Sequence, residues 1–122
     1  MVKIVQHALR IAAVACVITT PFFRGDGMAR AEDAVTVQLS IKNHRFIPAE
    51  ITAPAGKPIM LRIKNLDSTP AEFESVTLRV EKVIAGNSEG VIRLRALEPG
   101  RYKFVDDFNK ETTQGTLLVS PR

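Results

Sequence analysis

The chain has 122 residues, with 17 Lys or Arg, 13 Asp or Glu and a formal net charge of +4, and its length suits a single domain. It contains no basic stripe with interleaved aromatic residues, so the composition does not indicate a nucleic-acid partner. A single cysteine excludes an internal disulfide, and the fold must therefore be held by its apolar core.

The first 31 residues have the organisation of a secretory signal peptide. Lys3 and Arg10 flank the start of a short apolar run, and an A-x-A cleavage pattern ends at Ala31. The apolar run is shorter than a comfortable bilayer-spanning helix. We therefore expect residues 1–31 to be removed and residues 32–122 to act in the periplasm without direct membrane insertion. An uncleaved membrane anchor is the alternative interpretation.

Removal of this leader changes the charge and the chemistry of the protein. Four of the 17 bases and one of the 13 acids lie in the leader, which leaves 13 bases, 12 acids and a net charge of +1. The leader also contains the only cysteine, Cys16, and one of the two histidines, His7. His44 is then the only imidazole of the mature domain.

The remaining chain begins with a strand and an irregularity. Apolar and polar residues alternate over residues 35–41, as in a half-buried strand. The alternation slips before Phe46, which predicts a β-bulge near Asn43 and His44.

Short strand-like segments continue to the C-terminus, separated by turns that contain Pro, Gly or Asn. In the run 91–97, Ile92, Leu94 and Ala96 are expected to share one face, and a turn is expected at 87–90. The other expected strands are 59–65, short runs within 72–86, 101–107 and 115–120. This spacing predicts an all-β fold, a Greek-key antiparallel β-sandwich.

Two parts of the sequence resemble the cupredoxin family. Residues 44–65, HRFIPAEITAPAGKPIMLRIKN, resemble its opening strands, and LEPGRYKF with the later GTLLV resembles its closing strands. Tyr102 stands where Greek-key sandwiches place a corner tyrosine. The resemblance covers residues 34–120 and implies a cupredoxin-like fold for residues 32–122.

The ligands of a blue-copper site are missing from the matching positions. Such a site needs two His, one Cys and usually a weak Met. The resemblance implies the Cys position at Asp106, one His at Asn109, the Met near Thr113 and the other His at Ala71 or Glu72. A type 1 copper centre is therefore excluded.

A closer resemblance is to the cupredoxin-like domains of bacterial periplasmic iron uptake. The segments PAEFESVTLRVEKVIAG, LEPGRYKF and TTQGTLLV are similar to EfeO-type domains and to the small periplasmic partners of the ferrous-iron permease. The resemblance implies a protein that binds or passes metal, with iron favoured over copper. Its partner would be a membrane iron permease or another periplasmic iron-uptake protein.

The candidate metal ligands are mostly carboxylates. Asp106, Asp107 and Glu111 lie between the last two strands, and Glu72 and Glu74 lie in an earlier segment. The resemblance implies that these two regions meet at one end of the sandwich. Carboxylate oxygens suit iron, manganese or calcium. The alternative is a solvated acidic loop.

Two further side chains have a functional and a structural interpretation. His44 is a candidate ligand for iron or copper, or a partly exposed residue at a strand irregularity. Glu81 is a candidate oxygen ligand, or a surface residue paired with a base on a neighbouring strand.

Two functions therefore compete at the level of sequence. The first is a metal-binding module of an iron-uptake system. The second is a metal-free β-sandwich that binds a protein partner. A third function, an oxidase acting alone, is the least favoured, because a domain with one His and no thiolate lacks the usual copper ligands. Ser75, Ser88 and Ser120 have no evident histidine to activate them.

Overall fold

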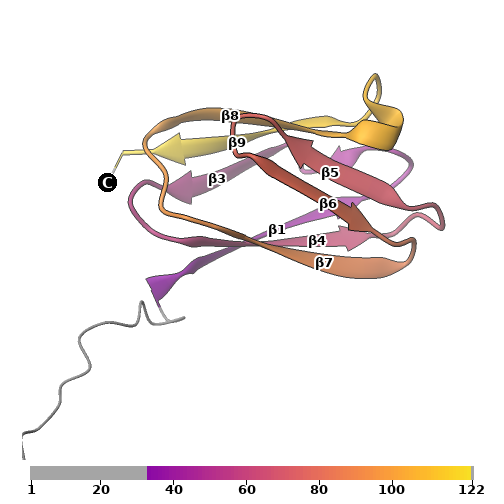
Figure 1. Cartoon of the computed structure of the whole chain (residues 1–122), viewed down its shortest axis with the longest axis horizontal. Coiled ribbons are helices and arrows are strands. Elements are labelled where there is room, and N and C mark those ends of the chain that lie inside the picture. Colours follow the sequence, from indigo (N-terminus) through magenta and orange to yellow (C-terminus); the bar gives the residue numbers. More distant parts are fainter. Residues whose placement is uncertain (1–32, 122) are drawn as a thin grey trace, which may run out of the picture.

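The computed structural model describes residues 33–121, and the predicted leader at 1–31 lies outside them. Two sheets pack face to face in a β-sandwich (Figure 1). The elements are β1 (Val35–Ile41), β2 (Phe46–Ile47), β3 (Glu50–Pro54), β4 (Ile59–Asn65), β5 (Ala71–Ser75), β6 (Val80–Ile84), β7 (Ser88–Leu94), β8 (Gly100–Asp106), the 3₁₀-helix η2 (Asp107–Asn109) and β9 (Gln114–Ser120). Among the described residues, no helix is long and apolar enough to cross a membrane.

The strand order confirms the predicted sandwich and refines its topology. The four-stranded sheet has the order β2-β1-β4-β7, and the five-stranded sheet has the order β3-β9-β8-β5-β6. The pairs β1–β4 and β3–β9 are parallel, whereas the sequence predicted antiparallel pairing throughout. The chain passes through β3 in the other sheet between β1 and β4, so β4 re-enters beside β1 in the same direction.

The expected bulge near Asn43 and His44 is a tight turn instead. Lys42 and Arg45 exchange backbone hydrogen bonds of 3.0 and 3.1 Å, and Asn43 and His44 have φ values of 51° and 54°. Two central residues with positive φ are the mark of a type I′ hairpin turn. The turn restores the alternation, which places Phe46 in the core.

The β6–β7 connection also differs from the prediction. The chain turns at 86–87, and the residues predicted as a turn at 87–90 mostly belong to β7. β7 ends at Leu94, so its alternation does not extend to Ala96, which is exposed. Leu97 is buried in its place.

Three phenylalanines join the two sheets at the centre of the core. Phe104 on β8 lies 4.9 Å, between ring centroids, from both Phe46 on β2 and Phe73 on β5. All three rings are buried. Aromatic pairs of this kind contribute about 1 kcal/mol beyond the area that they bury.

The corner tyrosine is confirmed. The hydroxyl of Tyr102 donates a 2.7 Å hydrogen bond to the backbone oxygen of Glu98, four residues earlier. This contact fastens the connection between β7 and β8, as in other Greek-key sandwiches.

Candidate functional site

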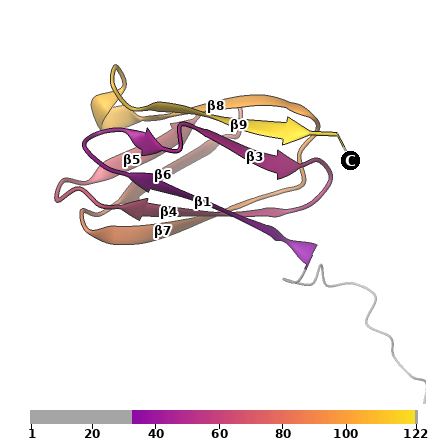
Figure 2. The ribbon, with the colours of Figure 1, turned by 180° about the vertical axis from the view of Figure 1, so that it is seen from behind.

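Three connections meet at one end of the sandwich: the β1–β2 turn, the β4–β5 loop and the β8–β9 connection with η2 (Figure 2). The Asp67 carboxylate accepts hydrogen bonds from the backbone N–H groups of Asn43, at 2.7 Å, and of His44, at 2.9 Å. These bonds hold the left-handed turn in place. The bond from His44 is the main cause that lowers the pKa of Asp67 below its ordinary value.

Asp106 ends β8 and faces inward, opposite Phe73 on β5. Its side chain is only 1% exposed. One carboxylate oxygen accepts from the backbone N–H of Glu72, at 2.9 Å, and of Phe108, at 3.1 Å. The other oxygen accepts from the side-chain amide of Asn109, at 3.1 Å. Asp106 therefore caps η2 and ties it to β5.

Thr113 and Asn109 complete this buried network. Thr113 is fully buried, and its hydroxyl donates to the backbone oxygen of His44. The backbone N–H of Thr113 donates to the oxygen of Asn109 at 3.0 Å. The network of Asp106, Asn109 and Thr113 thus occupies the positions that the resemblance assigns to the copper ligands. Ala71, at another of these positions, is buried and has no donor atom in its side chain.

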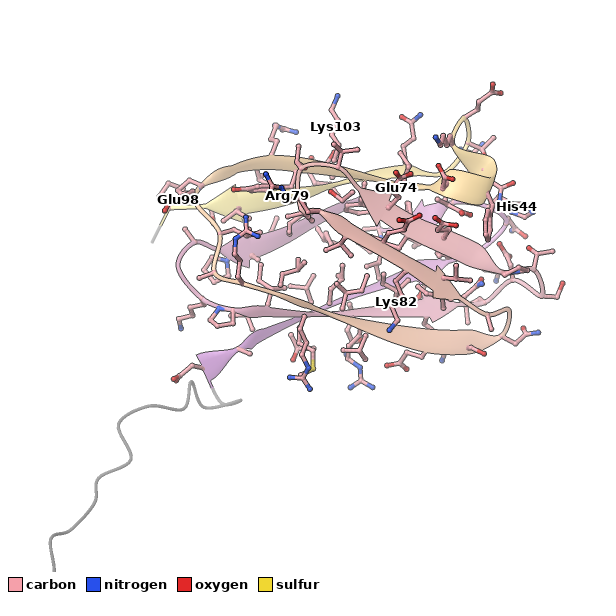
Figure 3. All side chains as sticks on the ribbon, viewed as in Figure 1. His44, Glu74, Arg79, Lys82, Glu98 and Lys103 are labelled. Atoms are coloured by element: carbon pink, nitrogen blue, oxygen red, sulfur yellow. The ribbon has the colours of Figure 1, made fainter. Side chains whose placement is uncertain are left out.

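A second group of polar residues lies on the outer face of the five-stranded sheet. It is defined here as the carboxylate cluster: Glu72 and Glu74 from β5, Glu81 from β6 and Asp107 from η2. Glu74 lies directly opposite Glu81 in the β5–β6 pair. The carboxyl group of Glu72 interacts with that of Glu81, and the carboxyl group of Glu74 interacts with that of Asp107; these interactions are the main causes that raise the pKa values of Glu72 and Glu74. Figure 3 shows Glu74 on this open face, away from the core.

The electrostatics of the carboxylate cluster are those of crowded like charges. The hydrogen bond with Glu81, partial desolvation and repulsion by the neighbouring carboxylates raise the pKa of Glu72 from 4.5 to about 7. The hydrogen bond with Asp107 raises the pKa of Glu74. Lys110 lies 2.8 Å from Asp107 and is the main cause that lowers the pKa of that carboxyl. One lysine thus compensates only part of the negative charge.

The structure brings together only some of the predicted ligands. Glu72, Glu74 and Asp107 meet in the carboxylate cluster, and Asp106 lies in the buried network behind them. His44 is 48% exposed, with its Nδ1 3.9 Å from an Asp67 oxygen. Glu111 is exposed. Within residues 33–121, no group of three or more His, Cys, Asp or Glu side chains is placed so that it could hold a metal ion.

Glu81 is the member of the carboxylate cluster that the sequence interpretation undervalued. It was expected to pair with a base across the strands, but it lies opposite Glu74. A hairpin over 72–86 puts Glu81 on the face of Glu72 and Glu74 in this register, whereas a shift by one residue would put it on the other face, so the sequence alone did not give this position.

The raised pKa of Glu72 predicts a pH-dependent stability. The folded protein binds this proton more tightly than the unfolded chain does, so stability contributed by the protonated form is lost as pH rises from 4.5 to about 7. The pKa values of Asp67 and Asp107 are lowered, so the stability that their charged forms contribute changes only at pH values below this window. We expect the melting temperature to fall slightly across it in wild type and to change less in Glu72→Gln. Parallel thermal melts from pH 4.5 to 7.5 measure this, and identical slopes would contradict it.

Comparisons with known proteins agree with this architecture. A model of the cupredoxin-like domain family matches residues 9–119. The chain is also 31% identical over 122 residues to the uncharacterized protein RP394 of Rickettsia prowazekii (strain Madrid E). That alignment covers 96% of this chain and 98% of the relative.

Solved structures with the same fold include copper proteins. The metal-binding domain of the Cu(I)-exporting P-type ATPase CopA of Streptococcus pneumoniae D39 has a TM-score of 0.63 and 18% identity, over 75% of this chain and 91% of that one. Auracyanin A, a blue copper protein of Chloroflexus aurantiacus, has a TM-score of 0.61 and 16% identity, and the match covers 71% of this chain and 99% of that one. A purple cupredoxin of Nitrosopumilus maritimus has a TM-score of 0.53 and 20% identity, and the match covers 68% of this chain and 98% of that one. At these identities the similarity is one of fold alone.

Proposed function

The chain belongs to the cupredoxin-like domain family, and from this we propose that it is an exported, metal-handling member of that family. It binds a hard cation, iron before others, at the carboxylate cluster, and it serves a periplasmic iron-uptake system. Its partner there is a membrane iron permease or another iron-uptake protein. The observation that supports the proposal is the placement of four carboxylates from β5, β6 and η2 on one open face, close enough to raise the pKa values of Glu72 and Glu74; a cation would have to draw these side chains together.

Copper of the type bound by the blue and purple relatives does not fit the residues of this chain. The positions of its ligands hold Asp106, Asn109 and Thr113, which provide no sulfur or imidazole donor. The two carboxylate oxygens of Asp106 are already engaged by three N–H donors. These side chains therefore do not form a copper site of that type.

The carboxylate cluster has the donor chemistry that iron, manganese or calcium takes. Without a cation, the interactions with Glu81 and Asp107 and the repulsion between neighbouring carboxylates raise the pKa values of Glu72 and Glu74, so these two groups hold protons more tightly than usual. A bound cation replaces such protons and neutralises the cluster. Binding should therefore weaken as pH falls below about 7, where Glu72 becomes protonated.

The test is calorimetric titration of the protein with Fe²⁺ under anaerobic conditions, and with Mn²⁺ and Cu²⁺. The protein is produced from its full sequence, so that its own N-terminal segment directs its export. We expect saturable binding of Fe²⁺ and Mn²⁺, and a loss of affinity of about tenfold or more in Glu74→Gln. Glu111→Gln is the matched control, because the same change is made at an exposed carboxylate outside the carboxylate cluster. Equal affinities for both variants would reject the carboxylate cluster as the site.

The buried network around Asp106 favours a second candidate function, a metal-free domain that recognises a protein partner. A site whose ligand positions are filled by internally bonded side chains supports the fold without a cation. This candidate predicts titration heats no larger than those of dilution for every metal. It also predicts a cellular phenotype that Glu74→Gln leaves unchanged.

A further inference from the structure

β7 is an edge strand of the four-stranded sheet, and Ile84 and the stem of Lys82 from β6 lie beside its inward-facing Gly90. In the described part of the chain it pairs with β4 alone, and it borders the molecule in both views of the ribbon (Figures 1 and 2). Its neighbour in sequence, β6, belongs to the other sheet. The backbone groups of β7 that point away from β4 therefore form a ladder edge open to another strand.

The other three sheet edges carry features that oppose strand addition. β2 has only two residues. β3 ends in Pro54, which has no N–H to donate. β6 has Lys82 at its centre, so antiparallel self-pairing there would set two lysines against each other. β7 has seven residues, no proline and no charged residue pointing inward.

The sequence of β7 is complementary to itself in one antiparallel register. With a two-fold axis beside Val91, Glu89 of one copy stands opposite Arg93 of the other, and the reverse pair forms on the far side of the axis. The two Val91 side chains meet at the centre of the same outer face. Gly90 stands opposite Ile92 on the inner face.

The side chains of this outer face are suited to such a contact. Val91 is 38% exposed and lies on the outer face of β7. Arg93 lies beside Met60 of β4, and it makes no ion pair within residues 33–121. Glu89 is held by Arg62 at 2.6 Å, and the arginine of a second copy would approach from its other side.

We propose that the protein forms a two-fold symmetric dimer through antiparallel pairing of β7 with β7 of a second copy. The two four-stranded sheets then join into one continuous sheet, with the order β4-β7-β7-β4 at its centre. The pairing leaves the carboxylate cluster on the other sheet uncovered. A single strand pair buries less surface than a standard interface of about 1,600 Å², so the dimer dissociates on dilution.

The test is sedimentation velocity of the protein, exported with its own N-terminal segment, from micromolar to millimolar concentration. We expect the mass to double over this range in wild type. Arg93→Glu, which sets two pairs of carboxylates against each other, and Glu89→Arg, which sets two pairs of guanidinium groups against each other, should each stay monomeric. Circular dichroism spectra confirm that both variants are folded.

Mixing the two variants separates the register from a general effect of charge. In the mixture, each introduced charge faces an opposite charge across the two-fold axis, so a heterodimer forms although neither variant dimerises alone. Arg95→Glu, outside β7, is the control and should dimerise like wild type. A wild type that stays monomeric at millimolar concentration overturns the proposal, as do an Arg93→Glu dimer and a mixture without heterodimer.

Discussion

Replacement of Asp106 by alanine is expected to lower the free energy of unfolding by about 3 kcal/mol. The wild-type carboxylate satisfies the backbone N–H groups of Glu72 and Phe108 and the side-chain amide of Asn109. In a site that is 1% exposed, the variant leaves these donors without their acceptor. It also removes the cap of η2 and frees this helix from β5. Urea denaturation of wild type and variant measures the difference.

Two further variants isolate the cause of this loss. Asp106→Asn keeps the size and one acceptor oxygen, so its cost should be intermediate, about 1–2 kcal/mol. Glu111→Ala changes an exposed carboxylate in the same connection and should cost less than about 0.5 kcal/mol. If Asp106→Ala is as stable as Glu111→Ala, the carboxylate is not the cap that its contacts describe.

Replacement of Gly86 by alanine is expected to cost about 3 kcal/mol or more. A Cβ atom at this position would lie 2.1 Å from the backbone oxygen of Ser68 and 2.4 Å from its carbonyl carbon. Both atoms belong to the backbone of the β4–β5 loop, so a rotamer change cannot relieve the contact. Thermal melts and urea denaturation should both show the loss.

The surrounding hydrogen bonds explain why this loop cannot simply move away. The side-chain amide of Asn65, which is 1% exposed, donates to the backbone oxygens of Thr69, Ile84 and Ala85. The backbone N–H of Asn87 donates to the oxygen of Asp67 at 2.8 Å. These hydrogen bonds hold the β6–β7 turn against the β4–β5 loop.

Gly90→Ala is the matched control for this prediction. A Cβ at Gly90 would meet side-chain atoms of Ile84, the nearest at 2.9 Å, and the stem of Lys82 at 3.5 Å. Because this contact is longer than the one at Gly86 and involves side-chain rather than backbone atoms, its cost should be smaller, about 1–2 kcal/mol. Equal costs for the two variants would mean that the backbone contact at Gly86 relaxes.

The strands could be read from the sequence. The alternation over 35–41 and 59–65 is a local, period-two signal, and both segments are strands with these bounds. The corner tyrosine, Tyr102, was also predictable, because its partner Glu98 is four residues away.

The details that failed in the sequence interpretation depend on contacts between distant segments. The slip before Phe46 fits a bulge and a two-residue turn equally well. Only the carboxylate of Asp67, 23 and 24 residues further along, stabilises the left-handed residues Asn43 and His44 in the turn. In the same way, the position of Glu81 opposite Glu74 depends on the β5–β6 register.

The sequence by itself thus determined the β-sandwich, since its strands follow from residue identity and short-range periodicity. The tertiary structure alone decided which carboxylates meet. The carboxylate of Asp106 accepts from the backbone N–H of Glu72, 34 residues away, and Thr113 donates to the backbone oxygen of His44, 69 residues away. No local pattern in the sequence predicts such contacts. Such pairings form only when the two sheets pack, because the entropy cost of closing long loops is repaid by core burial.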